Sequence, residues 1–157
     1  GDVYKRQPSG SVIPRKVQWR NPLTEIIAAH HIPYVAQASP SNWRDLMKKA
    51  RKAAAANGPS FLNVLTSCNR GWRHATDTTI DVMRLAVETC YWPLYEVDNG
   101  VWKLNFKPKE KKPVEEWLKT QGRFSHLFQP QFRHVIEEIQ ARVDEEWAAL
   151  VKKCEAA

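Results

Sequence analysis

Apolar residues follow two different spacings along the chain, and the changes between them mark the expected elements. Helical spacing runs through Leu23–His31 and again through residues 41–57. Short, nearly continuous apolar runs at Tyr34–Ala36 and 60–68 predict two buried strands, as in a parallel sheet that is covered on both faces. Helical spacing returns in three later segments, 78–90, 114–120 and 131–153.

Capping and turn residues define several of these boundaries. Ser39 followed by Pro40 is typical of a helix N-terminus, because the serine oxygen can accept a backbone N–H and proline suits the first helical position. Gly58 is expected to end the same helix. Two strand-like runs within 92–106 flank Asp98–Gly100, whose Asn-Gly pair favours a tight hairpin since both residues tolerate positive φ.

The helical spacing also predicts which faces are buried. The apolar face of the helix at 41–57 should comprise Trp43, Leu46, Met47, Ala50, Ala53 and Ala54. The remainder is basic and is expected to be solvated: Arg44, Lys48, Lys49, Arg51 and Lys52. The stripe of the last helix should comprise Phe132, Ile136, Ile139, Val143, Trp147 and Leu150. Cys154 continues that stripe, and Cys90 follows the stripe of Ile80, Met83 and Val87, so both thiols are expected in the core.

The order of these elements describes an α/β unit with an antiparallel hairpin and a long C-terminal helix. Two inner strands are too few for a complete doubly wound sheet, so we expect part of the sheet to lie upstream of residue 1. The chain does not begin with Met, and residues 1–7 show no periodicity that connects them to the rest; we interpret them as a scar or a sequencing artefact. The remaining regions are an α/β region at 8–130 and a C-terminal helix at 131–157.

Composition limits the class of protein. The chain of 157 residues, 43% of them apolar, is long enough for one domain with a hydrophobic core. Its apolar runs fall short of the roughly 20 residues that cross a bilayer, so no membrane association is expected. Three widely spaced cysteines do not resemble a disulfide framework, which favours the cytoplasm. The net charge of +7 favours either an acidic partner or a solvated basic surface.

Cys68 is the main candidate for chemistry. It follows an expected buried strand, at the edge where ligands and catalytic groups collect in open α/β sheets. Gly71 allows a sharp turn, and Arg70 and Arg73 favour the thiolate that metal ligation and nucleophilic attack both require. A buried structural thiol is the alternative, because His74 forms no catalytic motif with it and no zinc-ligand spacing is present.

Three stretches of the chain, taken together, indicate a protein family more specifically than any single residue does. They are IPYVAQASPSNWRDLMKKARKA, GPSFLNVLTSCNRGW and AVETCYWPLYEVDNGVWKLNFKPKEKKPVEEWLKTQGRFSHLF. In this order and spacing they resemble the C-terminal part of the β subunit of pyruvate:ferredoxin oxidoreductase, or pyruvate synthase. The resemblance is dense over Ile32–Phe128.

This resemblance implies a thiamine diphosphate-binding fold, a mostly parallel sheet flanked by helices. It implies a complex that oxidatively decarboxylates pyruvate with CoA to acetyl-CoA and CO₂. Electrons would pass through a [4Fe–4S] cluster to ferredoxin, and the partners would be the alpha, gamma and delta subunits. Four cysteines hold the cluster in the family, and the fourth, in a strand-end loop, corresponds to Cys68 here.

Several family features are absent from this sequence. It lacks the first three cluster cysteines and the Gly-Asp-Gly…Asn stretch that binds magnesium and thiamine diphosphate. We therefore expect a truncated β subunit that has one metal ligand, Cys68, no catalytic or thiamine-binding residues, and no activity alone. Pyruvate is favoured over 2-oxoisovalerate and 2-oxoglutarate as the substrate. A basic nucleic-acid-binding module that uses the Arg44–Lys52 face is the less favoured alternative.

Overall fold

A computed structural model describes residues 20–156, so residues 1–7 and the beginning of the 8–130 region lie outside the described part. Its α-helices are α1 (Leu23–Ala28), α2 (Trp43–Ala55), α3 (Asn69–Trp72), α4 (Thr79–Glu88), α5 (Val114–Lys119) and α6 (Arg133–Glu155). Its strands are β1 (Tyr34–Ala38), β2 (Ser60–Val64), β3 (Tyr95–Asp98) and β4 (Val101–Leu104). Short 3₁₀ turns occupy Pro40–Asn42, Thr76–Thr78, Gly122–Phe128 and Pro130–Phe132.

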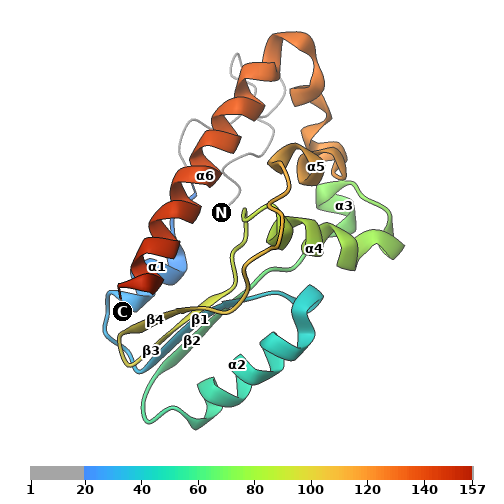
Figure 1. Ribbon diagram of the computed structural model, residues 1–157. Coiled ribbons are helices and arrows are strands. Elements are labelled where there is room, and N and C mark those ends of the chain that lie inside the picture. Colours follow the sequence, from blue (N-terminus) through green and yellow to red (C-terminus); the bar gives the residue numbers. More distant parts are fainter. Residues whose placement is uncertain (1–19, 157) are drawn as a thin grey trace.

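A mixed sheet of four strands in the order β2-β1-β3-β4 organises the fold (Figure 1). β1 pairs in parallel with β2 and antiparallel with β3, and β3 and β4 form the hairpin. The expected α/β class, with its parallel pair, antiparallel hairpin and long C-terminal helix, is confirmed. The hairpin extends the central sheet, because β3 is hydrogen-bonded to β1.

The hairpin turn has the predicted chemistry. Asn99 and Gly100 join β3 to β4 with φ values of 48° and 85°. Positive φ at two successive residues matches the right-handed twist of the flanking strands, and asparagine and glycine adopt it at low cost. The Asn99 amide also donates to the carbonyl of Pro33 at 2.8 Å, which ties the turn to the start of β1.

The two faces of the sheet are covered by different helices. All five residues of β1 are buried, so both faces are covered at the centre of the sheet. Val35 packs with Val97 and Leu150 under α1 and the C-terminal half of α6. Tyr34 faces the opposite helix, α2, where the Nζ atom of Lys52 lies 5.8 Å from its ring centroid. Successive residues of β1 therefore contact helices on opposite faces of the sheet.

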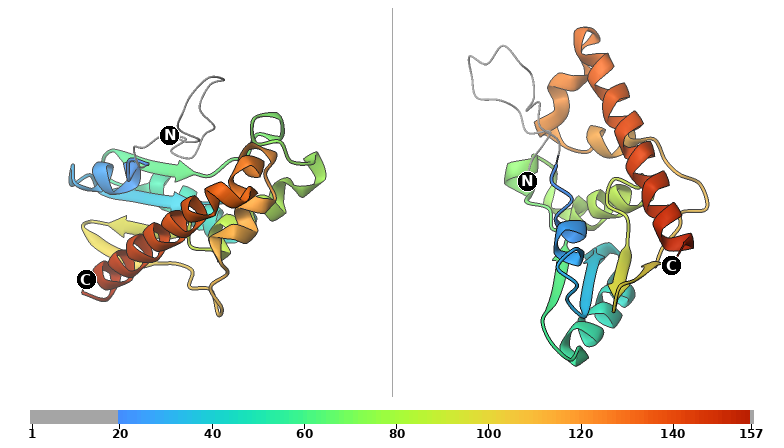
Figure 2. Two further views of the ribbon diagram at one scale, coloured as in Figure 1. Left: turned by 90° about the horizontal axis from the view of Figure 1, so that it is seen from above. Right: turned by 90° about the vertical axis from the view of Figure 1, so that its left-hand side faces the viewer.

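Two apolar cores lie along α6, which Figure 2 shows as one long helix that runs from the hairpin to the helices at the far end. Its first half packs with α4, α5 and the turn Gly122–Phe128, and its second half covers the sheet. The predicted stripe is confirmed at its four buried positions, Ile136, Ile139, Val143 and Leu150. None of the helices within residues 20–156 is long and apolar enough to cross a membrane.

The predicted burial of α2 is only partly confirmed, because Leu46, Ala50 and Ala53 are half-buried but Trp43, Met47 and Lys49 differ from the prediction. Trp43 and Met47 are 61% and 48% exposed, whereas Lys49 is 1% exposed. The Nζ atom of Lys49 donates to Asp45 Oδ2 at 2.6 Å and to the carbonyl of Gln37, in β1, at 2.8 Å. Burial lowers the pKa of this lysine, although the hydrogen bond and charge of Asp45 oppose the shift. Lys49 therefore does not belong to the solvated basic face.

A second polar contact joins α2 to the sheet. Glu96, buried in β3, accepts hydrogen bonds from the Tyr34 hydroxyl at 2.7 Å and from Lys52 Nζ at 2.9 Å. Burial would raise the pKa of Glu96, but these hydrogen bonds outweigh it and hold the pKa below its ordinary value. The interface under α2 therefore depends on paired charges.

The prediction for the stripe of α4 is only partly confirmed. Met83, Val87 and Cys90 are buried, but Ile80 is 43% exposed. Cys90 lies just beyond the end of α4 and has a φ of 58°, so it reaches the core from the helix terminus. Cys154, near the end of α6, is only partly buried.

We expect Asp45→Ala to lower the free energy of unfolding by about 2–3 kcal/mol, because it leaves the buried Lys49 ammonium with a carbonyl as its partner. Chemical denaturation of the variant measures this loss. Lys48→Ala, at the exposed neighbouring position, is the matched control and should stay within about 0.5 kcal/mol of the parent. Equal losses in the two variants would contradict a structural role for the buried ion pair.

Candidate functional site

The candidate site lies at the carboxyl edge of the two parallel strands. Because β1 and β2 run in the same direction, the segments that follow them emerge at one edge. The Leu65 amide donates to the carbonyl of Ala38 at 3.0 Å and extends the pairing one residue beyond β2. Cys68 comes three residues later. Cys68 therefore follows a strand, as predicted, but this strand ends at Val64 and is only partly buried, whereas the sequence predicted a buried strand.

The backbone around Cys68 forms a single helical turn where the sequence predicted a loop. Cys68 is the N-cap of α3, and its Sγ accepts the backbone N–H of Gly71 at 3.3 Å. The Trp72 amide donates to the Cys68 carbonyl at 2.8 Å. A sulfur that caps a turn in this way faces a backbone donor, and such a donor suits an anionic thiolate.

The three cysteines occupy different environments, which decides one of the alternatives left open by the sequence. Cys68 is exposed, so it is not a buried structural thiol. Cys90 is buried, and burial raises its pKa to about 11. Cys154 is partly buried, and burial also raises its pKa. Of the three thiols, Cys68 is the most exposed.

Side chains beside α3 hold the turn in shape. The Asn69 side chain donates from Nδ2 to Thr76 Oγ1 at 2.8 Å, and the His74 amide donates to the Asn69 carbonyl at 3.2 Å. The donor placed on Cys68 Sγ is the Gly71 amide, while Arg70 and Arg73, which the sequence suggested as thiolate partners, have exposed side chains. The stabilising group at the sulfur is therefore a fixed backbone dipole.

The described residues provide one potential ligand at this edge. Within residues 20–156 there is no group of three or more His, Cys, Asp and Glu side chains that could hold a metal ion. His74, the base nearest to Cys68 in sequence, has its Nδ1 2.8 Å from the carbonyl of Ala75. A complete metal site would need ligands from outside this part of the chain.

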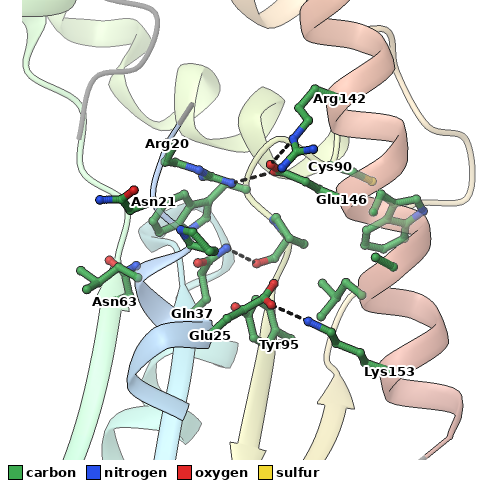
Figure 3. A pocket seen from close by; sticks show the side chains of 17 residues that line it. Arg20, Asn21, Glu25, Gln37, Asn63, Cys90, Tyr95, Arg142, Glu146 and Lys153 are labelled. Carbon is green, nitrogen blue, oxygen red and sulfur yellow. Dashed lines mark hydrogen bonds and ion pairs between the residues drawn. The ribbon is translucent and has the colours of Figure 1, made fainter. Parts of the chain in front are cut away.

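A separate pocket of about 240 Å³ lies between α1, the sheet and α6 (Figure 3). Its floor is a buried polar chain in which Asn63 donates to Thr24, Thr24 donates to Gln37, and Gln37 donates to the carbonyl of Pro93. This series of hydrogen bonds was not predictable from the sequence, because its members lie on four different segments.

The charged groups around this pocket are paired. Arg20 contacts Glu146 at 3.4 Å, and Lys153 contacts Glu25 at 2.5 Å. Arg142 also pairs with Glu146, at 3.0 Å (Figure 3). Two of these ion pairs join α6 to Arg20 and to Glu25 of α1, so the described lining of the pocket holds α6 to this part of the chain.

Comparison with known proteins finds relatives along most of the chain. It is 46% identical over 145 residues to the pyruvate synthase subunit PorB of Thermotoga maritima. The matched region covers 92% of this chain and 45% of that protein. It is 44% identical to the PorB subunit of Methanocaldococcus jannaschii, over 88% of this chain and 45% of that protein. It is 45% identical to the ketoisovalerate oxidoreductase subunit VorB of Pyrococcus abyssi, over 83% of this chain and 42% of that protein.

The chain is a homologue of part of these PorB and VorB subunits. The resemblance drawn from its sequence motifs is thereby confirmed. The chain spans a little under half the length of these curated relatives. No protein-family model matches it.

We expect iodoacetamide to alkylate Cys68 first in the native 157-residue chain. The rate at Cys90 should be lower than the rate at Cys68 by a factor on the order of a hundred, because the Cys90 thiol is buried and little of it ionises near neutral pH. Peptide mapping by mass spectrometry measures the rate at each cysteine. In denaturant the rates should converge, and similar rates in the native chain would contradict the environments described above.

Proposed function

We propose that this chain is part of the β subunit of a pyruvate:ferredoxin oxidoreductase and contributes Cys68 as one ligand of a [4Fe–4S] cluster. The complete enzyme would oxidatively decarboxylate pyruvate with CoA, and ferredoxin would accept the electrons. Its partners would be the alpha, gamma and delta subunits in the cytoplasm. The remainder of the β subunit would supply the other cluster cysteines and the groups that bind magnesium and thiamine diphosphate.

The observation that carries this proposal is the similarity to PorB proteins over most of the chain, at 42–46% identity. It is joined by the position of Cys68, whose exposed thiol lies at the carboxyl edge of the parallel strands. Neither observation alone would distinguish a cluster ligand from an accessible thiol. Together they favour the ligand.

The residues present fit one corner of such a cluster. Cluster iron is held by cysteine thiolates that come from separated segments of chain, and Cys68 offers an accessible sulfur with a backbone N–H from Gly71. Hydrogen bonds to cluster sulfurs are one means by which proteins tune reduction potential. When bound, the cluster would supply one-electron transfer; the residues of this chain hold its ligand in place.

Exposed apolar side chains support association with further protein. Trp43 and Met47 are exposed on α2, and Val101 is 57% exposed on the hairpin. Trp43 and Met47 lie four residues apart on one face of α2, and neighbouring exposed apolar side chains are typical of an interface. They would be covered by the rest of the subunit or by its neighbours, which agrees with a chain that has no activity alone.

Ketoisovalerate is the second candidate substrate. A VorB subunit is 45% identical to the chain, almost the same as the 46% of a PorB subunit. The similarity therefore supports oxidation of a 2-oxoacid more strongly than it supports a particular one. Steady-state rates of the complete complex with pyruvate and with 2-oxoisovalerate would separate the two.

We expect Cys68→Ala, introduced into the complete β subunit, to reduce the bound cluster iron and the EPR signal of the reduced cluster by more than about tenfold after anaerobic reconstitution. The reason is that a cubane cluster with three thiolate ligands exposes one iron to solvent and to loss. Iron analysis and EPR provide the measurement.

Cys90→Ala and Cys154→Ala are the matched controls, because they remove thiols that lie in or near the core. Both should retain the cluster signal. Equal signals in all three variants would refute the assignment of Cys68. Upstream coding DNA with no in-frame Cys-x-x-Cys and no Gly-Asp-Gly segment would refute the proposed subunit as a whole.

A further inference from the structure

The turn that presents Cys68 cannot be stable by itself. α3 has four residues, and an isolated helical turn of this length does not persist in water. Residues 68–71 are all exposed, so burial does not hold this part of the turn. Besides the hydrogen bonds that Asn69 makes with Thr76 and His74, the turn is held by contacts of the two residues that follow, Trp72 and Arg73.

Both of these residues are held by one distant segment, Gln121–Arg123, which follows α5 and includes the first two residues of the turn Gly122–Phe128. The Gly122 amide donates to the carbonyl of Arg73 at 3.0 Å. The guanidinium carbon of Arg123 lies 3.9 Å from the ring centroid of Trp72. The segment thus contacts the last residue of α3 and its C-cap, about 50 residues away in sequence.

Glycine at position 122 is required by close approach. A Cβ atom there would lie 2.9 Å from Arg73 Cβ and 3.1 Å from the Arg73 carbonyl oxygen. The second contact is with backbone, so it could be relieved only by displacement of the Arg73 peptide. Arg73 itself has a φ of 58°, a conformation that is unfavourable for a residue with a side chain and must be held by its surroundings.

The guanidinium of Arg123, which lies over the ring of Trp72, is also held by Gln121. Its Nε and Nη2 atoms donate to Gln121 Oε1 at 2.9 and 2.7 Å. Gln121 is 1% exposed and donates in turn to the carbonyl of Trp117 at 2.8 Å. A planar guanidinium held in this way can stack on an aromatic face, which the ammonium of lysine cannot do. On another side, Trp72 meets Trp117 edge-to-face at 6.0 Å.

We infer that Gln121, Gly122 and Arg123 form a positioning clamp that fixes the turn carrying Cys68. The importance of the clamp for an iron–sulfur cluster rests on the function proposed above. Its effect on the turn does not, because the contacts lie within the described chain. Gly122 contacts Arg73 and Arg123 contacts Trp72, so the clamp acts on Cys68 through these two residues.

Hydrogen exchange in the full 157-residue chain tests the clamp at a distance from the substitutions. In Gly122→Ala and in the milder Arg123→Lys, the amides of residues 71–74 should exchange about three- to tenfold faster than in the parent chain. Peptides that cover residues 66–76 report this, since the amides of Gly71, Trp72 and His74 are hydrogen-bonded within the turn. The thermal midpoint is measured in parallel.

Leu150→Ala is the matched control, because Leu150 is buried in the core under the sheet and lies outside the clamp. It should lower the thermal midpoint and leave exchange at 66–76 within twofold of the parent. Unchanged exchange at 66–76 in both clamp variants would overturn the inference. An equal increase of exchange at 66–76 in Leu150→Ala would also overturn it, since it would show that exchange there follows the global stability of the chain.

The complete β subunit separates this inference from the proposed function. If the parent subunit binds a cluster, the clamp variants should retain the iron and shift the EPR spectrum of the reduced cluster, whereas Leu150→Ala should leave the spectrum unchanged. An identical spectrum in clamp variants and parent would overturn the role of the clamp at the cluster. A parent subunit that binds no cluster would refute the proposed function, and the exchange measurement would still decide the clamp.

Discussion

β1 takes part in two ladders of opposite kind, parallel to β2 on one side and antiparallel to β3 on the other. Its side chains alternate between α2 on one face and α1 with α6 on the other. A shift of one residue in register would exchange Tyr34, whose hydroxyl binds the buried Glu96, with Val35, which packs against Leu150. Because neither side chain suits the other environment, the register of β1 determines where both layers of helices can lie.

The two faces are held by different physical means. Under the second half of α6 the contacts are largely apolar and tolerate small adjustments, because dispersion and burial depend little on direction, whereas α1 adds the hydrogen bond from Thr24 to Gln37. Under α2 the contacts include Lys49 with the carbonyl of Gln37 and Lys52 with Glu96, which require specific partners and distances. Paired charges in a buried interface add little net stability, but they penalise incorrect arrangements strongly. The polar face therefore helps to specify the position of α2, while the apolar face supplies most of the burial.

Much of the fold was predictable because its signals are local. The Asn99-Gly100 turn and the apolar stripe of α6 depend on nearby residues, and both were found. In α2 the burial of Lys49 was not predicted, because helical spacing places this lysine on the solvated face. The spacing does not show that the carbonyl of Gln37 and the carboxylate of Asp45 both accept hydrogen bonds from it. The strand-end position of Cys68 was predictable from the apolar run before it. The clamp was not predictable from the sequence. Glycine is required at position 122 because the Arg73 peptide lies close to it, and only the tertiary fold brings these two positions together.

The length of α6 has a mechanical consequence. A helix of 23 residues is about 34 Å long and resists bending, and this one is anchored at Leu150 over the sheet and at Ile136 beside the helices near Cys68. Because one helix packs into both cores, α6 sets the spacing between the sheet and the helices α4 and α5.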